Sequence, residues 1–240
     1  MKPFRLCLIL LLMGWLSCHP YALWADVWLV AAGVSDYPGK RNDLVLPQKD
    51  AETIAALYRL NSNAHVSVLT NDKATSGNIV KEMKKLFAKA GKDDIIVLFF
   101  SGHGVKGAFC AYDGFLNYET IRDCMAGTKA KNKMIFADAC FSGKIRQKGH
   151  AKTSSPMNVM LFLSSRDNEA SIETPFMKNG FFTSCLQRSL RGGADVNGDR
   201  IITARELFDA VSVGVKTLSR DKQHPVMWGN FDDNMPVMVW

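Results

Sequence analysis

The sequence predicts an α/β fold in which a mostly parallel central sheet is flanked by helices on both faces. Two observations support this class. Four continuous apolar runs are typical of strands that are buried on both faces, as they are in parallel sheets. The runs cover residues 27–34, 94–100, 133–137 and 159–163. Segments with helical periodicity separate these runs, and the alternation of strand and helix favours parallel pairing.

The segments between the runs carry helix signals. The predicted helices cover residues 50–60, 79–90, 117–125, 180–190 and 203–218. Thr75 or Ser76 can cap the second helix, Gly91 ends it, and Thr203 can cap the last. The smaller predicted elements are a strand at 65–69, a hairpin at 106–112 and an edge strand at 225–228. Residues 144–156 are polar and basic without apolar periodicity, which predicts a long exposed loop.

The composition fits one folded domain. The chain has 240 residues, of which 47% are hydrophobic and 22% are charged, and these are ordinary globular values. Residues 26–240 are enough for one sizeable core. The formal net charge is +7, but the lysines are scattered rather than interleaved with aromatic residues. We therefore expect no binding to nucleic acid. As a separate expectation, the protein is a monomer.

Residues 1–25 are predicted to be a signal peptide. Lys2 and Arg5 form a short positive end, and the apolar run at 6–16 is too short to span a bilayer. Cleavage after Ala25 would leave residues 26–240 as the mature domain. In the alternative, Leu16-Ser17-Cys18 serves as a lipoprotein signal, Cys18 is lipidated and the protein is tethered to a membrane. Both predict export, to the periplasm or outside the cell.

Six cysteines are present, and two of them lie in the export segment. Of the other four, Cys110 and Cys124 flank the same irregular region. In an oxidising compartment they could form a disulfide, or they could remain two partly buried thiols, and the sequence supports either. No Cys-x-x-Cys spacing indicates a metal site.

Two predicted strands end in residues that can carry chemistry. Ser101-Gly102-His103-Gly104 follows one buried run, and Asp138-Ala139-Cys140-Phe141-Ser142-Gly143 follows the next along the chain. Because ligands bind outside the carboxyl ends of parallel strands, we expect the imidazole and the thiol to meet. A cysteine nucleophile needs a proton carrier. It also needs donors for an oxyanion, and the N–H groups of Gly104 and Cys140 could supply them.

Together these two motifs resemble the catalytic pair of the caspase-like cysteine peptidases, and the pattern is most similar to metacaspases and bacterial caspase-like proteins. The resemblance also includes residues 29–37, Asp50-Ala51 and Gly180-Phe181-Phe182-Thr183, so it covers essentially all of residues 26–240. It implies the three-layer caspase-haemoglobinase sandwich and the activity of a cysteine endopeptidase.

The resemblance also implies roles for particular residues. Cys140 would be the nucleophile, and His103 would transfer a proton to the leaving group, with no cofactor required. Asp50, Ser101 and Asp138 would form an acidic pocket, so the expected partners are peptides or proteins cut after Arg or Lys. Pro47 departs from the family, since metacaspases typically have a cysteine near this pocket.

Several alternatives stay open. Asp50 could serve only as a helix N-terminal acid. The domain could be a catalytically silent module that binds peptides, or it could ligate peptides through the same thioester. The basic residues of the loop at 144–155 make it a candidate for self-cleavage, and an uncut surface loop is the other interpretation.

One segment resembles a calcium loop. Its oxygen-bearing residues at positions 1, 3, 5, 9 and 12 are Asp195, Asn197, Asp199, Thr203 and Glu206. The sixth position should be glycine but is Arg200. A calcium-responsive binding protein is therefore a further hypothesis. The alternative is a polar turn in which Thr203 and Glu206 form a capping box for the last helix.

Overall fold

A computed structural model describes residues 25–139, 159–166 and 177–240 of the chain. Its centre is a six-stranded sheet with the order β10-β8-β7-β3-β1-β2. The strands are β1 (Val27–Gly33), β2 (Ala64–Thr70), β3 (Ile95–Gly102), β7 (Asn132–Ala139), β8 (Val159–Leu163) and β10 (Val226–Trp228). Neighbouring strands are parallel except at the edge, where β10 runs antiparallel to β8. The predicted fold class and edge strand are confirmed.

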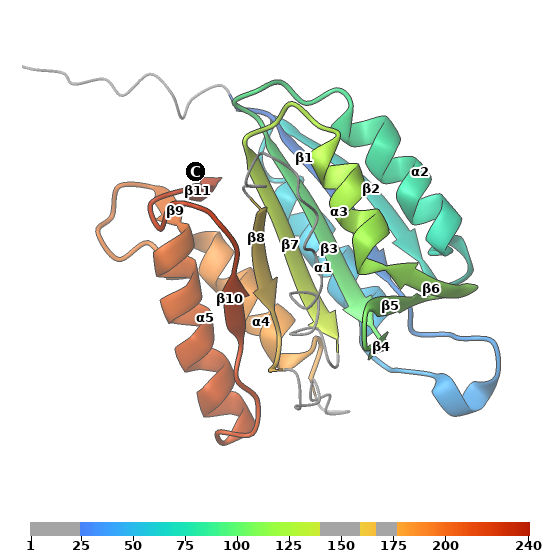
Figure 1. Cartoon of the computed structure of the whole chain (residues 1–240). Helices are drawn as coiled ribbons and strands as arrows, with labels where there is room; N and C mark the ends of the chain where they lie inside the picture. Colours follow the sequence, from blue (N-terminus) through green and yellow to red (C-terminus); the bar gives the residue numbers. More distant parts are fainter. Residues whose placement is uncertain (1–24, 140–158, 167–176) are drawn as a thin grey trace, which may run out of the picture.

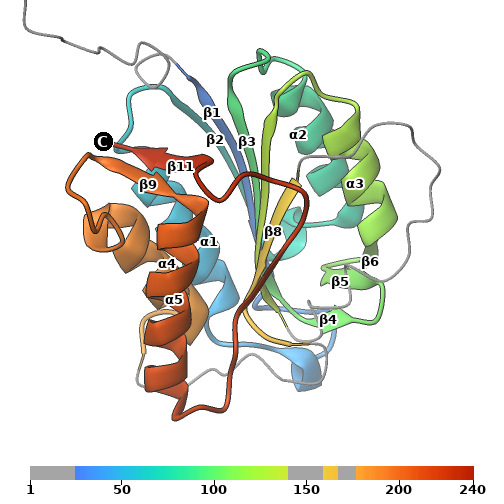
Figure 2. The same ribbon diagram turned by 60° about the vertical axis from the view of Figure 1, so that its left-hand side comes forward.

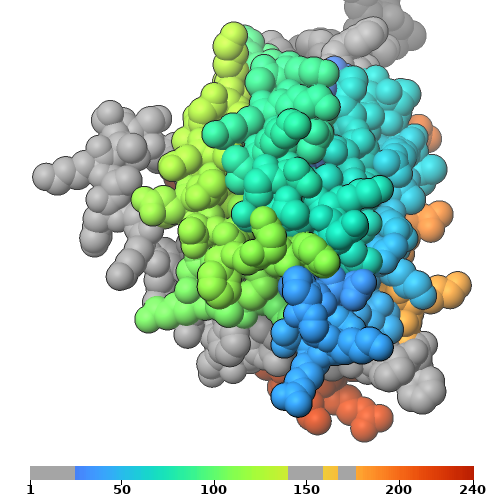
Figure 3. All heavy atoms as spheres, turned by 90° about the vertical axis from the view of Figure 1, so that its right-hand side faces the viewer, coloured from blue at the N-terminus to red at the C-terminus, as the bar shows by residue number. Residues whose placement is uncertain are grey.

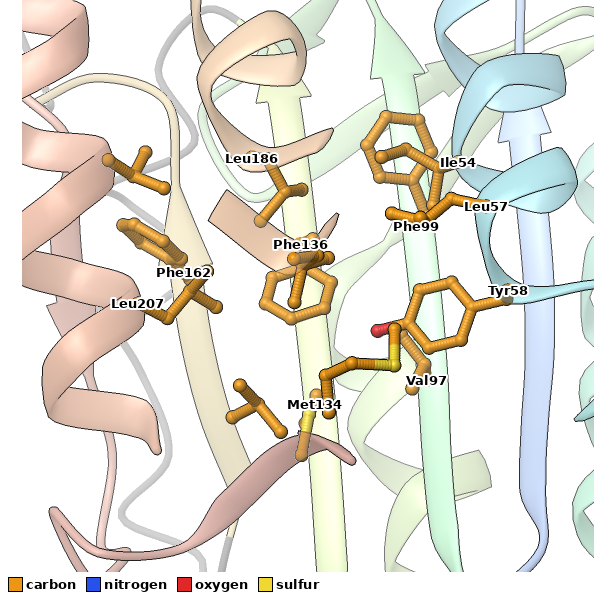
Figure 4. Packing of buried hydrophobic residues seen from close by; sticks show 14 of the residues in the cluster. Ile54, Leu57, Tyr58, Val97, Phe99, Met134, Phe136, Phe162, Leu186 and Leu207 are labelled. Carbon is orange, nitrogen blue, oxygen red and sulfur yellow. The ribbon is translucent and has the colours of Figure 1, made fainter. Parts of the chain in front are cut away.

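Helices cover both faces of the sheet and form three layers (Figures 1 and 2). One outer layer contains α2 (Ser76–Phe87) and α3 (Tyr118–Ala126). The other contains α1 (Pro47–Tyr58), α4 (Phe181–Arg188) and α5 (Ala204–Ser219). Each interface has its own apolar cluster. Figure 4 shows the cluster under α1, α4 and α5, where Phe99 and Phe136 of the sheet face Ile54 and Leu186 of the helices. The double-sided burial explains the continuous apolar runs of the sequence.

Helix boundaries differ from the predicted ones by a few residues. The first helix begins at Pro47 rather than at Asp50, because proline suits the first helical position, where its missing N–H is not needed. In α2 the predicted cap is confirmed, since Thr75 accepts a hydrogen bond from the Asn78 N–H. After α4 the helical segment continues through Ser189 and Leu190, and it ends where Arg191 and Gly192 leave the helical conformation, as predicted.

The short strands outside the central sheet differ most from the predicted elements. The predicted hairpin is a three-stranded sheet of β4 (Gly104–Val105), β5 (Ala108–Ala111) and β6 (Gly114–Asn117). A second small sheet pairs β9 (Ile201–Thr203) with β11 (Pro236–Val239), and it was not predicted. Strands of two to four residues carry too few side chains to establish an alternating pattern.

The segment with calcium-loop spacing closes on itself through hydrogen bonds. Asp195 accepts from the N–H groups of Gly198 and Arg200, and Arg200 has a positive φ of 66°. Thr203 and Glu206 form the capping box of α5. Within the described ranges, no three His, Cys, Asp or Glu side chains gather as a metal site would require. The capping box is confirmed, and calcium binding stays a prediction that a calcium titration by calorimetry would check.

Replacing Thr203 with alanine should lower the free energy of unfolding by about 1 kcal/mol, the typical value of an N-cap side chain. The substitution removes the oxygen that accepts from the Glu206 N–H at 3.2 Å. Urea denaturation measures the change. Thr217→Ala, in the last turn of the same helix, is the matched control and should change stability by less than about 0.5 kcal/mol. Equal effects of the two substitutions would contradict the capping role.

The described residues test two other groups of predictions only in part. Cys124 is buried on α3 and forms no disulfide with Cys110. Residues 1–24, which contain Cys18 and nearly all of the predicted signal peptide, lie outside the described residues, as does the predicted loop at 144–156. In the described part of the chain, no helix is long and apolar enough to cross a membrane.

Candidate active site

The carboxyl ends of β3 and β7 lie side by side at one edge of the sheet (Figure 1). The parallel register places Ser101 opposite Asp138 and Gly102 opposite Ala139. His103 directly follows β3. Cys140 directly follows Ala139 in the sequence and lies outside the described residues. The predicted alignment of the two motifs is therefore confirmed up to the residue before the cysteine.

The loop before α1 contacts the His103 ring. His103 Nε2 lies 2.9 Å from the carbonyl oxygen of Asn42, in the 3₁₀ helix η1 (Lys40–Asn42). A carbonyl oxygen can only accept, so Nε2 must donate, and in the neutral ring Nδ1 is left as the proton acceptor. In Figure 3 the segment before α1, coloured blue, projects at the lower end of the molecule, beside the atoms of the three-stranded sheet of β4, β5 and β6. The contact fixes which ring nitrogen can exchange a proton.

Two buried carboxyl groups lie next to this edge. Asp50 of α1 is 1% exposed and Asp138 of β7 is 7% exposed. Asp50 Oδ2 accepts from the Ser101 hydroxyl at 2.8 Å. Its other oxygen, Oδ1, accepts from the Asn179 side chain at 2.8 Å and from the Gly180 N–H at 3.1 Å. The predicted pocket residues Asp50, Ser101 and Asp138 are therefore brought together.

The start of α4 holds the second carboxyl group. Asp138 Oδ2 accepts from the Thr183 N–H at 3.2 Å and from its hydroxyl at 2.9 Å. Together with the Gly180 N–H, these donors belong to the N-terminal turn of a helix, where N–H groups lack helical partners and the dipole favours negative charge. A helix of the outer layer thus supports both carboxyl groups, although they come from different elements.

Gly180 shows how close the two groups are. A Cβ atom at this position would lie 2.6 Å from Asp138 Oδ2 and 3.5 Å from Asp50 Oδ2. Only glycine leaves room there, and both carboxyl groups face the same point. Burial, and secondly the charge of Asp138, raises the pKa of Asp50 to about 8. Two acids crowded together away from water form a site that a cation would stabilise.

The remaining predicted residues are placed only in part. Gly104 begins β4 and is buried, one residue beyond His103. Because Cys140 lies outside the described residues, the predicted pair of oxyanion donors stays a prediction. Pro47, the departure from the metacaspase pattern, is the buried first residue of α1, one turn before Asp50.

Several groups that support the site were not predicted from the sequence. Asn179 and Thr183 orient the carboxyl groups. Thr183 lay in a segment that resembles the family, but nothing in the sequence indicated its contact with Asp138 or that of Asn179 with Asp50. The Asn42 contact is made by a main-chain carbonyl, which every residue has, so no residue type could have indicated it.

Comparisons with known proteins identify the family and the fold. A family model described as a caspase domain matches residues 28–235. The chain is similar to protein GSU0716 from Geobacter sulfurreducens, with a TM-score of 0.68, 20% identity and coverage of 89% of this chain and 99% of that chain. It is also similar to caspase-1 from Spodoptera frugiperda, with a TM-score of 0.66, 14% identity and coverage of 89% of each chain. No curated protein sequence matches the chain.

The solved structures, at these identities, support the fold alone. The family model goes further, because it extends from β1 nearly to β11 and includes both motifs and both carboxyl groups. The resemblance inferred from the sequence is confirmed. The chain belongs to the caspase domain family, a family of cysteine peptidases.

Proposed function

We propose that this protein is an exported cysteine endopeptidase that cleaves peptide bonds after Arg or Lys. One observation carries the proposal: the buried carboxyl groups of Asp50 and Asp138 lie at the same sheet edge as His103. An apolar or aspartate-binding pocket would not contain two acids. A substrate guanidinium or ammonium group would offset the repulsion between them and supply donors to both.

The proposed reaction uses Cys140 and His103. The thiol proton of Cys140 passes to Nδ1 of His103 as the sulfur attacks the scissile carbonyl carbon, and the C–N bond breaks as His103 gives that proton to the departing amine. Water then attacks the thioester and releases the acid, which regenerates the thiol. Cys140 directly follows Ala139 in the sequence. Ala139 pairs with Gly102, the residue before His103.

The direct test compares peptides that differ at one residue. Fluorogenic peptides with Arg, Lys, Asp or Leu before the cleaved bond should be cut with kcat/KM in the order Arg and Lys, then Leu, then Asp. We expect at least about 100-fold between Arg and Asp, since a substrate carboxylate would be repelled by the charge of Asp138 and would find a second buried acid, Asp50, beside it. Preference for Asp would contradict the proposal. Binding of the Arg peptide without cleavage would favour the silent binding module.

Two other parts of the proposal have separate tests. An added amine nucleophile would reveal ligation, because a transferase converts the thioester to a new amide rather than an acid. Export depends on residues 1–25, and N-terminal sequencing of the exported protein distinguishes the two processing routes. A chain beginning at Asp26 supports the signal peptide, and a lipidated Cys18 supports the lipoprotein alternative.

The pocket should respond to pH. Because the pKa of Asp50 is raised to about 8, the free protein keeps this proton at neutral pH. A bound guanidinium favours the carboxylate, so binding below pH 8 must release the proton. We therefore expect KM for an arginyl peptide to fall as pH rises from 6 to 8, with a smaller change for a leucyl peptide.

The raised pKa of Asp50 also predicts how the free energy of unfolding depends on pH. The folded state binds the Asp50 proton more tightly than the unfolded state does, so the free energy of unfolding should fall as pH rises from about 4 toward 8. Urea denaturation at several pH values measures the trend. Asp50→Asn should reduce this decrease in the free energy of unfolding with pH, whereas Asp72→Asn, at an exposed site, should leave it unchanged. Identical trends in the two variants would contradict the assignment.

A further inference from the structure

The main chain of His103 is held by a buried phenol. Tyr37 is 8% exposed, and its hydroxyl accepts from the His103 N–H at 2.9 Å and donates to the Cys110 carbonyl at 2.9 Å. The Cys110 N–H in turn donates to the His103 carbonyl at 2.8 Å. The hydroxyl therefore joins the turn that carries His103 to the neighbouring strand β5, and both main-chain groups of His103 are engaged.

The absence of a side chain at Gly102 leaves space for the Tyr37 hydroxyl. Its φ of 152° lies in the region that favours glycine, and a Cβ there would be 2.7 Å from the Tyr37 hydroxyl oxygen. The glycine before the histidine is thus explained by Tyr37, which occupies the space that a side chain would need. Its role is to let the phenol approach the backbone.

The same loop also holds the imidazole ring. The Tyr37 N–H donates to Asp43 Oδ1 at 3.1 Å, and Asp43 follows Asn42, whose carbonyl accepts from His103 Nε2. The rings of Tyr37 and His103 are 5.0 Å apart and tilted by 42°. Residues 37–43 therefore hold His103 twice, through its main chain by a hydroxyl and through its ring by a carbonyl.

We infer that Tyr37 is a positioning residue for His103, and this inference rests on the proposed function. Its hydroxyl holds the His103 main chain so that Nε2 can donate to Asn42 while Nδ1 is presented to the leaving group. Loss of the hydroxyl removes one acceptor from the turn and lets the ring adopt other positions. Proton delivery to a poor leaving group then becomes slower, because small misplacements of a catalytic group cost much of its effect.

The test uses two substrates with the same arginyl group, a 4-nitroanilide and a 4-nitrophenyl ester. The anilide needs a proton to leave, and the ester does not. First-turnover release of the leaving group, with enzyme in excess, isolates acylation. Tyr37→Phe should slow the anilide by about 10- to 100-fold and the ester by less than about threefold, with little change in substrate binding. An unchanged ratio of anilide to ester rate would overturn the inference.

Two controls make the result specific. Tyr58→Phe removes a buried hydroxyl that has no hydrogen-bond partner among the described residues and that points into the core cluster (Figure 4). It should leave the anilide-to-ester ratio at its wild-type value. His103→Ala calibrates the full effect. If His103→Ala does not change the ratio, the proposed role of His103 is wrong, whereas a change there without one in Tyr37→Phe refutes only the role of Tyr37.

A second pair of variants tests the loop if Tyr37→Phe folds poorly. Asp43 is exposed, so its substitution should be tolerated. Asp43→Ala removes the acceptor of the Tyr37 N–H and should lower the anilide rate selectively by about threefold or more. Asp43→Asn keeps a side-chain oxygen and should restore the ratio. Selective loss with rescue supports the inference, and equal ratios in both variants would refute it.

Discussion

Replacing Cys140 with alanine should lower kcat/KM for an arginyl peptide by about 10⁴-fold, because the thioester can no longer form. His103→Ala should cost at least about 10²-fold, the usual contribution of a positioned proton donor. The two losses should not add in the double variant, since both residues act in the same acylation step. Steady-state kinetics on the two single variants and the double variant measures all three values.

Control substitutions distinguish the nucleophile from other thiols. Cys124→Ala, on α3 in the opposite layer from α4, should leave kcat/KM within about threefold of the wild type, as expected for a buried thiol that acts as a small hydrophobic residue. If Cys140→Ala retained full activity, the assignment of the nucleophile would be wrong.

Replacing Asp138 with asparagine should lower kcat/KM for arginyl and lysyl peptides by about 100-fold or more. The substitution keeps the shape of the side chain and an oxygen that can accept from Thr183, but it removes a charge that the substrate cation needs. A leucyl side chain has no cation to pair with the charge of Asp138, so kcat/KM for a leucyl peptide should change by less than about threefold. The ratio between the two substrates is the measurement.

Stability provides the counterpart to this prediction. Burial and, secondly, the charge of Asp138 raise the pKa of Asp50, so removing the Asp138 charge relieves repulsion between the two acids. The free energy of unfolding of Asp138→Asn should therefore be unchanged or higher than that of the wild type. Equal loss of activity on arginyl and leucyl peptides, together with lower stability, would show that Asp138 is structural and does not select the substrate.

The pocket residues were predicted from the resemblance to metacaspases, and the geometry of parallel strands explains why two of them meet. Parallel strands align their carboxyl ends, so an acid that ends one buried strand meets a serine that ends the next, as Asp138 and Ser101 do. Asp50 was left with two interpretations, and the structure shows features of both. It lies in the first turn of α1, yet it is buried and hydrogen-bonded to Ser101 and Asn179 rather than exposed near the helix end.

Other features depend on tertiary contacts that leave no pattern in the sequence. Lys133 was counted among the scattered lysines, but it is 8% exposed, and its ammonium group donates to the Met125 carbonyl at 2.8 Å. Burial lowers its pKa. A charged side chain at the start of a strand is ordinarily exposed, and only the tertiary position of Lys133, beneath the end of α3 and the turn after it, gives its ammonium group the carbonyls of Met125 and Thr128 as acceptors. The strands β9 and β11 were also not predicted, because each is recognisable as a strand only through its pairing with the other.

The central claim is that Cys140 acts as a nucleophile on substrates with a basic residue before the cleaved bond. Labelling the protein with an arginyl acyloxymethyl ketone, followed by peptide mapping in a mass spectrometer, tests it most directly. We expect one adduct per chain on Cys140, at least about 100-fold faster labelling than by the aspartyl analogue, and slower labelling in Asp138→Asn. An adduct on another residue, or faster labelling by the aspartyl analogue, would contradict the account.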